Sequence, residues 1–141
     1  MLNFLYPLVP KIAEEPNIEL NMVFTSAQIK TLLNDTKKYI WGAYEGSGDY
    51  IELLPKEYLE KFVFDKSYET AKYAYNEKIS FFGYPDDFQE KTYPNSIMTE
   101  YYFKGIDPDV GGLDWTSLRF IFELYKDNWY LVGIISNQQT F

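Results

Sequence analysis

Two apolar strand patterns on either side of a short polar turn most constrain what this chain can fold into. Residues 116–125 and 129–137 are rich in β-branched and aromatic side chains, and Lys126-Asp127-Asn128 separates them. A two-residue turn at Asp127-Asn128 would join them as an antiparallel hairpin. That turn predicts the cross-strand pairs Leu124 with Leu131, Phe122 with Gly133, Phe120 with Ile135, Leu118 with Asn137, Tyr125 with Tyr130, Glu123 with Val132, Ile121 with Ile134, and Arg119 with Ser136.

This register gives the predicted hairpin two unlike faces. The even-numbered residues of 118–124 share an almost wholly apolar face, on which Phe122 would cover the gap that Gly133 leaves. The other face mixes apolar groups with Arg119 and Glu123. We therefore expect the first face to pack on the core, and the second to be partly covered or to face a ligand.

Helix signals are confined to the first half of the chain. Thr25 and Gln28 have the spacing of a capping box, followed by apolar residues at helical spacing, which predicts a helix at 26–34. Pro55 stands where a first helical residue would, and an amphipathic pattern follows it. That pattern predicts a second helix at 55–64.

Strand patterns occupy most of the remainder. Residues 39–44 are rich in aromatic side chains, and residues 96–103 alternate in the manner of a strand with two different faces. Residues 67–82 fit a helix or a strand, and the glycines and proline of 105–114 indicate a loop. Together the elements predict an α+β fold, in which a curved antiparallel sheet packs against a few short helices.

The length of 141 residues fits one domain. Residues 1–24 contain Pro7, Pro10 and Pro16, each of which removes a backbone donor, so we expect an extended N-terminal arm with an edge strand at its end. Residues 25–141 are then the single α+β domain. The apolar start is broken by proline and lacks a basic region, so the sequence as written predicts no signal peptide.

Composition excludes several classes of function. The chain has no cysteine and no histidine, which excludes disulfides, thiolate or imidazole catalysis and Cys- or His-ligated metals. Its net charge of −8 argues against nucleic acid as a partner. No run approaches the ~20 apolar residues that span a bilayer. We therefore expect no membrane span, no cofactor, no metal and no assignable catalytic residue.

Carboxylate side chains suggest two candidate sites, a calcium loop and an acid–base pair, and the sequence favours a structural interpretation of both. The loop carboxylates of Asp107, Asp109 and Asp114 lack the ligand spacing and closing glutamate of a calcium loop, which favours a solvated turn. Glu100 and Glu123, on neighbouring strands, could act as an acid–base pair if they lay about 5–10 Å apart. Exposed glutamates are common on strands, so we expect Glu100 and Glu123 to be ordinary surface residues.

Aromatic side chains give the best candidate for a ligand site. Apolar concavities with a few polar groups are the usual small-molecule sites. The candidate ligand-binding residues are Trp41, Tyr44, Tyr101, Asp114, Trp115, Arg119 and Glu123.

Several segments are similar to a family of bacterial proteins to which no activity is assigned. They are DWTSLRFIFE (114–123), WYLVGII (129–135), WGAYEGSG (41–48), EY (57–58), FVFD (62–65) and YPNS (93–96). Members are mostly lipoproteins or secreted proteins of Gram-positive bacteria, so the resemblance implies an extracytoplasmic location. Their helices followed by a curved sheet resemble the cystatin-like cone of nuclear-transport-factor-like domains. The histidine and tryptophan near the end of family members are absent here, where residues 136–141 are SNQQTF.

These observations favour a non-enzymatic binding or interaction domain, with an aromatic-lined pocket or patch for a small molecule or a protein. One alternative is a cone-fold enzyme that uses carboxylates and tyrosines in an enclosed pocket. Another is a structural module that forms a homodimer through the open sheet face. The sequence leaves these alternatives open and names neither ligand nor partner.

Overall fold

The protein's structure is a computed structural model that describes residues 24–44, 46–79 and 93–138. The described residues fall into two compact units: a helical unit within residues 24–66 and a sheet unit within residues 67–138. Both contain antiparallel strands and short helices, so the chain has the predicted α+β fold.

Two predictions about the organisation of the chain stay predictions. The extended arm at 1–24 lies outside the described residues except for Phe24. The division that treats 25–141 as one domain stays a prediction.

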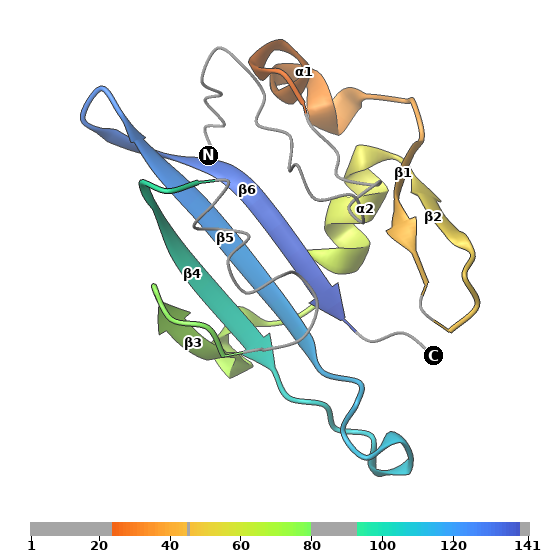
Figure 1. The fold of residues 1–141 in the computed structure, drawn as a ribbon. Helices are drawn as coiled ribbons and strands as arrows, with labels where there is room; N and C mark the ends of the chain where they lie inside the picture. The colour runs from red at the N-terminus through yellow and green to blue at the C-terminus, as the bar shows by residue number, and fades with distance from the viewer. Residues whose placement is uncertain (1–23, 45, 80–92, 139–141) are drawn as a thin grey trace. The chain divides into compact units, whose positions relative to one another are not determined.

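The helical unit combines a two-stranded hairpin with two helices (Figure 1). Its elements are α1 (Ser26–Thr31), the 3₁₀ turn η1 (Leu32–Asn34), β1 (Tyr39–Ala43), β2 (Tyr50–Leu53) and α2 (Pro55–Phe62). The predicted helix at 26–34 is present, with its last turn tightened to 3₁₀. The predicted strand at 39–44 and the helix at 55–64 are also present, each slightly shorter than predicted.

Local hydrogen bonds explain where both helices start. The Thr25 hydroxyl accepts from the Gln28 N–H (3.3 Å), and the Gln28 side chain accepts from the Thr25 N–H (2.8 Å), which confirms the predicted capping box. At α2 the side chain of Glu57 accepts from the backbone N–H of Leu54 (2.9 Å), just before Pro55. These contacts satisfy donors that a helix start would otherwise leave open.

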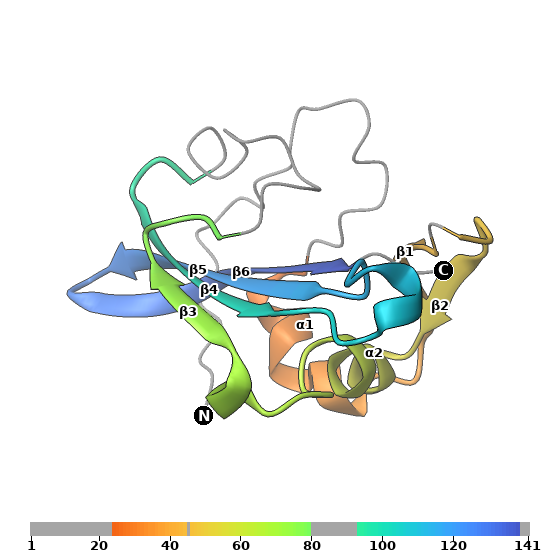
Figure 2. The same ribbon diagram turned by 90° about the horizontal axis from the view of Figure 1, so that it is seen from below.

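The sheet unit is a four-stranded antiparallel sheet with strand order β3-β4-β5-β6. Its elements are the 3₁₀ turn η2 (Tyr68–Thr70), β3 (Lys72–Tyr75), β4 (Ser96–Phe103), the 3₁₀ turn η3 (Pro108–Val110), β5 (Thr116–Tyr125) and β6 (Asn128–Gln138). Figure 2 shows the strands as one layer. The ambiguous stretch from residue 67 is therefore a 3₁₀ turn followed by a strand, as far as residue 79.

The hairpin predicted for 116–137 is confirmed, but its predicted register is wrong. The two residues of the turn are Lys126 and Asp127, because Tyr125 pairs with Asn128. Both turn residues have positive φ (46° and 63°), as a type I′ turn requires. The Asn128 side chain donates to the Lys126 carbonyl (3.0 Å), which supports the turn from the first residue of β6.

A β-bulge changes the register a second time. Phe122 pairs with Leu131, whereas Ile121 pairs with Gly133, so β6 holds one extra residue between these pairs. Phe122 therefore does not cover Gly133, contrary to the prediction. Ile121 does so instead: a Cβ added at Gly133 would lie 3.3 Å from the Ile121 Cδ1 atom.

The faces of the sheet also differ from the prediction. We name them the Arg119 face and the Phe120 face after neighbouring residues of β5. The Arg119 face, expected to be partly solvated, buries Met98, Glu100, Ser117, Arg119 and Ile121. The Phe120 face, expected to be the core face, buries Phe103, Leu118 and Leu131 but leaves Leu124 54% exposed.

The turn assignment predicts the effect of two matched double substitutions. Non-glycine residues at positive φ are unfavourable by about 1 kcal/mol each, and Asn-Gly is the preferred type I′ pair. Lys126→Asn with Asp127→Gly should therefore raise the free energy of unfolding by about 1 kcal/mol. Denaturant titration measures this value.

The control places the same Asn-Gly pair one residue later, as Asp127→Asn with Asn128→Gly. In the observed register that change removes the Asn128 hydrogen bond and should lower stability. Stabilisation by the control pair instead would show that the turn lies at residues 127–128.

Candidate functional site

A buried polar cluster lies at the centre of the Arg119 face. Glu100 on β4 is completely buried and pairs directly across the ladder with Arg119 on β5. The Arg119 Nε atom lies 3.4 Å from Glu100 Oε2. The Ser117 hydroxyl donates to Glu100 Oε1 (2.6 Å), and the backbone N–H of Ile79 donates to Oε2 (2.7 Å). We call these groups the Glu100 cluster.

The Glu100 cluster holds two opposite charges that are buried in the protein interior. A carboxylate and a guanidinium lose their hydration in the interior, and only pairing with additional hydrogen bonds offsets that loss. Both carboxylate oxygens of Glu100 have protein partners. Arg119 is the only arginine of the chain, and a guanidinium is more weakly hydrated than the ammonium group of lysine. The contacts therefore give the cluster a structural role, joining β4, β5 and the segment after β3.

The geometry does not support an acid–base pair of Glu100 with Glu123. Glu100 lies opposite Arg119, whereas Glu123 lies opposite Ser96. The two glutamates are thus four positions apart along the ladder, or about 13 Å. This separation exceeds the range that a carboxylate pair needs.

Two of the seven candidate ligand residues belong to the helical unit, where each has a structural contact. The Trp41 ring stacks on Tyr58 with 4.1 Å between centroids and 9° between planes, and its Nε1 donates to the Leu53 carbonyl (2.9 Å). The Tyr44 hydroxyl accepts from the ammonium group of Lys61 (2.6 Å). Trp41 thereby joins β1 to α2 and β2.

The other candidate residues lie in the sheet unit but do not all share a face. Tyr101 pairs with Leu118 on the Phe120 face, and its ring lies 5.9 Å from that of Phe120. Arg119 is on the opposite face. Trp115 is buried against Tyr102, with 6.0 Å between centroids. Tyr101 and Arg119 are therefore separated by the sheet and cannot contact one small ligand on one face.

Asp114 organises the loop between β4 and β5. Its carboxylate accepts from the backbone N–H groups of Ile106 (3.0 Å) and Asp107 (3.2 Å). The hydrogen bond from Ile106 is the main cause that lowers the pKa of Asp114. A Cβ at Gly105 would lie 2.3 Å from both the Asp114 carboxylate and the Gly112 carbonyl, so this loop requires glycine there.

The residues that the structure describes offer neither a carboxylate cluster for a metal ion nor a helix suited to crossing a membrane. Among them, no group of three or more carboxylates is placed to hold a metal ion. No described helix has both the length and the apolar character needed to cross a bilayer.

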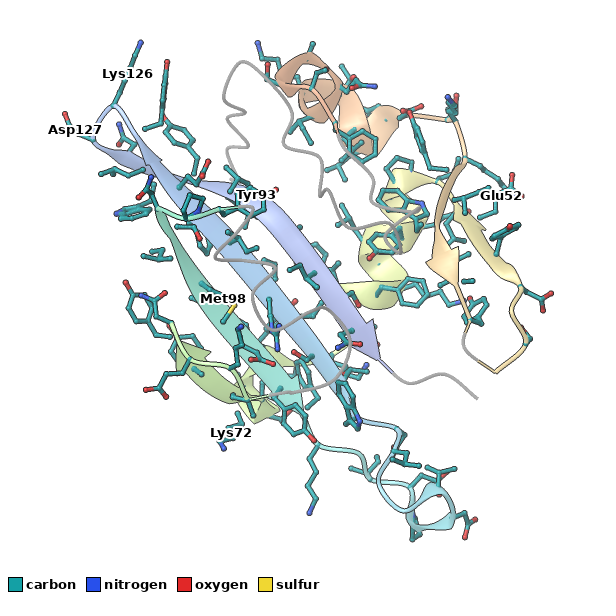
Figure 3. The ribbon with its side chains drawn as sticks, viewed as in Figure 1. Glu52, Lys72, Tyr93, Met98, Lys126 and Asp127 are labelled. Carbon is teal, nitrogen blue, oxygen red and sulfur yellow. The ribbon has the colours of Figure 1, made fainter. Side chains whose placement is uncertain are left out.

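The structure shows a surface that the predicted register concealed. Leu124, Tyr125 and Trp129 are 54%, 44% and 49% exposed at the end of the β5-β6 hairpin. Lys126 and Asp127 project from the same end (Figure 3). We call residues 124–130 the hairpin tip. A turn placed at Lys126-Asp127 would have revealed it, because that register pairs Leu124 with Trp129 beside the turn.

Comparison of the chain with models of known families, with curated proteins and with solved structures finds no match. The resemblance to exported bacterial domains and to the cystatin-like cone therefore stays a prediction.

Substitutions in the Glu100 cluster should reveal strong coupling. Removing one partner of a buried ion pair leaves an uncompensated charge, so Glu100→Met and Arg119→Met should each lower the free energy of unfolding by about 3 kcal/mol. The double variant should lose less than the sum, with a coupling of about 2 kcal/mol. Denaturant unfolding of the four proteins gives these values.

The matched control is the exposed pair of Lys56 and Glu60, whose charged atoms are 3.7 Å apart. Its coupling, from Lys56→Met and Glu60→Met, should be below about 0.5 kcal/mol. Equal coupling in the two cycles would contradict a special role for the buried pair.

The lowered pKa of Asp114 predicts a pH dependence. A carboxyl group whose pKa is lower in the folded state stabilises the protein above its unfolded pKa of about 3.9, and this stabilisation is lost as the pH falls through the folded pKa. In the Asp114→Asn variant, the free energy of unfolding should therefore decrease less steeply than in the wild type as the pH is lowered below about 5. Thermal unfolding measured across this pH range tests the effect, and an unchanged acid slope would contradict it.

Proposed function

We propose that this protein is a non-enzymatic interaction module that binds a partner protein through the hairpin tip. The observation that carries the proposal is the exposure of Leu124 and Trp129, which pair across the ladder on one face of the hairpin end, with Tyr125 exposed on its other face. Large apolar side chains that gather on a surface mark interaction sites more often than single ones do. Tryptophan and tyrosine are also the residues most enriched among energetic hot spots of interfaces.

The register explains why these side chains are not covered within the sheet. The ladder between β4 and β5 starts at the pair of Ser96 with Glu123, so the hairpin continues past the last β4 partner. Figure 1 shows the hairpin extending beyond the end of β4. Among the described residues the tip is therefore two-stranded, and none of their strands lies beside its apolar side chains.

Contacts within the tip hold its aromatic rings in place. Tyr125 and Tyr130 meet edge to face, with 6.3 Å between centroids. The Lys126 ammonium group lies 5.3 Å from the centre of the Tyr125 ring, within the range of a cation–π interaction. A surface ordered before binding loses less conformational entropy when a partner docks, which favours recognition at this end.

The resemblance to exported bacterial proteins is in keeping with this proposal. An extracytoplasmic module with a cystatin-like cone would present such a tip to other surface proteins. The aromatic side chains at the tip support a binding role, whereas the saturated contacts of Glu100 give no support to catalysis.

Site-specific photo-crosslinking in cells that carry the native chain tests the proposal. A benzophenone amino acid in place of Tyr125 should give discrete adducts with a partner on irradiation. Trp129→Ser should remove these adducts while changing the free energy of unfolding by less than about 0.5 kcal/mol, because Trp129 is half exposed.

The control carries the same amino acid in place of the exposed Glu52 on β2 (Figure 3). It should give no adduct of the same size. The absence of adducts from position 125, or identical adducts from both positions, would overturn the proposal.

A further inference from the structure

We infer that the outer edge of β3 pairs with β3 of a second copy of this chain, antiparallel and centred on Ala74. β3 is an outer strand of the sheet and has β4 as its partner on one side. Within the described part of the chain, no strand pairs with its other side. This edge lies at the opposite side of the sheet from β6, so the inference is independent of the hairpin tip.

The ladder to β4 shows which backbone groups of β3 point outward. The Asn76 N–H donates to the Met98 carbonyl (2.8 Å), and the Met98 N–H donates to the Asn76 side chain (2.8 Å). In an antiparallel ladder, bonded and non-bonded pairs alternate, so Ala74 is also bonded to β4. The N–H and C=O groups of Tyr73 and Tyr75 therefore point away from β4. Backbone N–H and C=O groups at this spacing can form hydrogen bonds with another extended strand.

The spacing of these groups makes the edge complementary to itself. When two copies are related by a two-fold axis at Ala74, Tyr73 of each copy lies opposite Tyr75 of the other. Each such pair can exchange both backbone hydrogen bonds. Ala74 then meets its own copy at a non-bonded position, where the closest approach of backbones favours a small side chain.

The side chains at this edge agree with a second copy as the occupant. Tyr73 and Tyr75 are 53% and 52% exposed, and the proposed register places them as cross-strand aromatic neighbours. Lys72 of each copy lies opposite Asn76 of the other, so no like charges are opposed. β3 is short and carries a lysine, and both features limit pairing of an edge strand with unrelated strands. The register in which the two copies complement each other is therefore favoured.

The first test measures molar mass by sedimentation equilibrium from 1 to 500 μM. We expect a reversible monomer–dimer equilibrium that salt strengthens, because each copy carries a net charge of −8 and salt screens their repulsion. A wild-type protein that stays monomeric over this range at both low and high salt would overturn the inference.

Backbone and side-chain variants locate the contact. Tyr73→Pro removes an N–H that points away from β4, so it should weaken dimerisation at least about tenfold while the monomer still unfolds cooperatively. Tyr73→Phe retains the N–H and the ring, and should dimerise as the wild type does. Equal dimerisation of the proline variant would show that another surface is used, and would overturn the inference.

A charge-swap pair keeps the test decisive if the proline variant fails to fold. In the proposed register, Tyr73→Lys with Tyr75→Lys places lysines opposite each other, and Tyr73→Glu with Tyr75→Glu places glutamates opposite each other. Each double variant alone should be monomeric, and an equimolar mixture should form a 1:1 dimer. Failure of the mixture to associate more strongly than either variant alone would overturn the inference.

Discussion

The buried carboxylate of Glu100 is the constraint on which the sheet unit depends. It meets Arg119 and Ser117 of β5 and the backbone of Ile79 beyond the end of β3. A one-residue slip between β4 and β5 would turn Arg119 away from Glu100 and leave two charges buried without partners. Neighbouring apolar residues fill the same face but would tolerate alternative packing more readily. The polar contacts therefore favour one register over its neighbours.

This constraint explains which parts of the structure could be predicted from the sequence. The capping box at Thr25, the helix from Pro55 and the terminal hairpin depend on local patterns, and all are present. The register failed because Lys126 adopts positive φ without glycine and because β6 contains a bulge. Neither feature has a distinct local signal.

The candidate residues of the sheet unit do not share one face, for a related reason. A face that mixes charged and apolar residues suggests contact with solvent or a ligand when each charge is considered alone, yet Glu100 and Arg119 form an ion pair across two strands. Tyr101 and Arg119 lie on opposite faces because they belong to adjacent ladder positions. Among the described residues, the hairpin tip and the edge of β3 carry aromatic side chains that are about half exposed. Their exposure depends on where neighbouring strands end, which composition alone does not reveal.

The most direct test of the role of Glu100 is amide hydrogen exchange at Ile79. This residue lies outside any helix or strand, so its N–H would exchange rapidly if it faced solvent. Its hydrogen bond to the buried Glu100 carboxylate predicts slow exchange instead, within about tenfold of the Met98 and Ile121 amides in the sheet. Exchange at Ile79 as fast as in an unstructured peptide, while the sheet amides stay protected, would contradict the account.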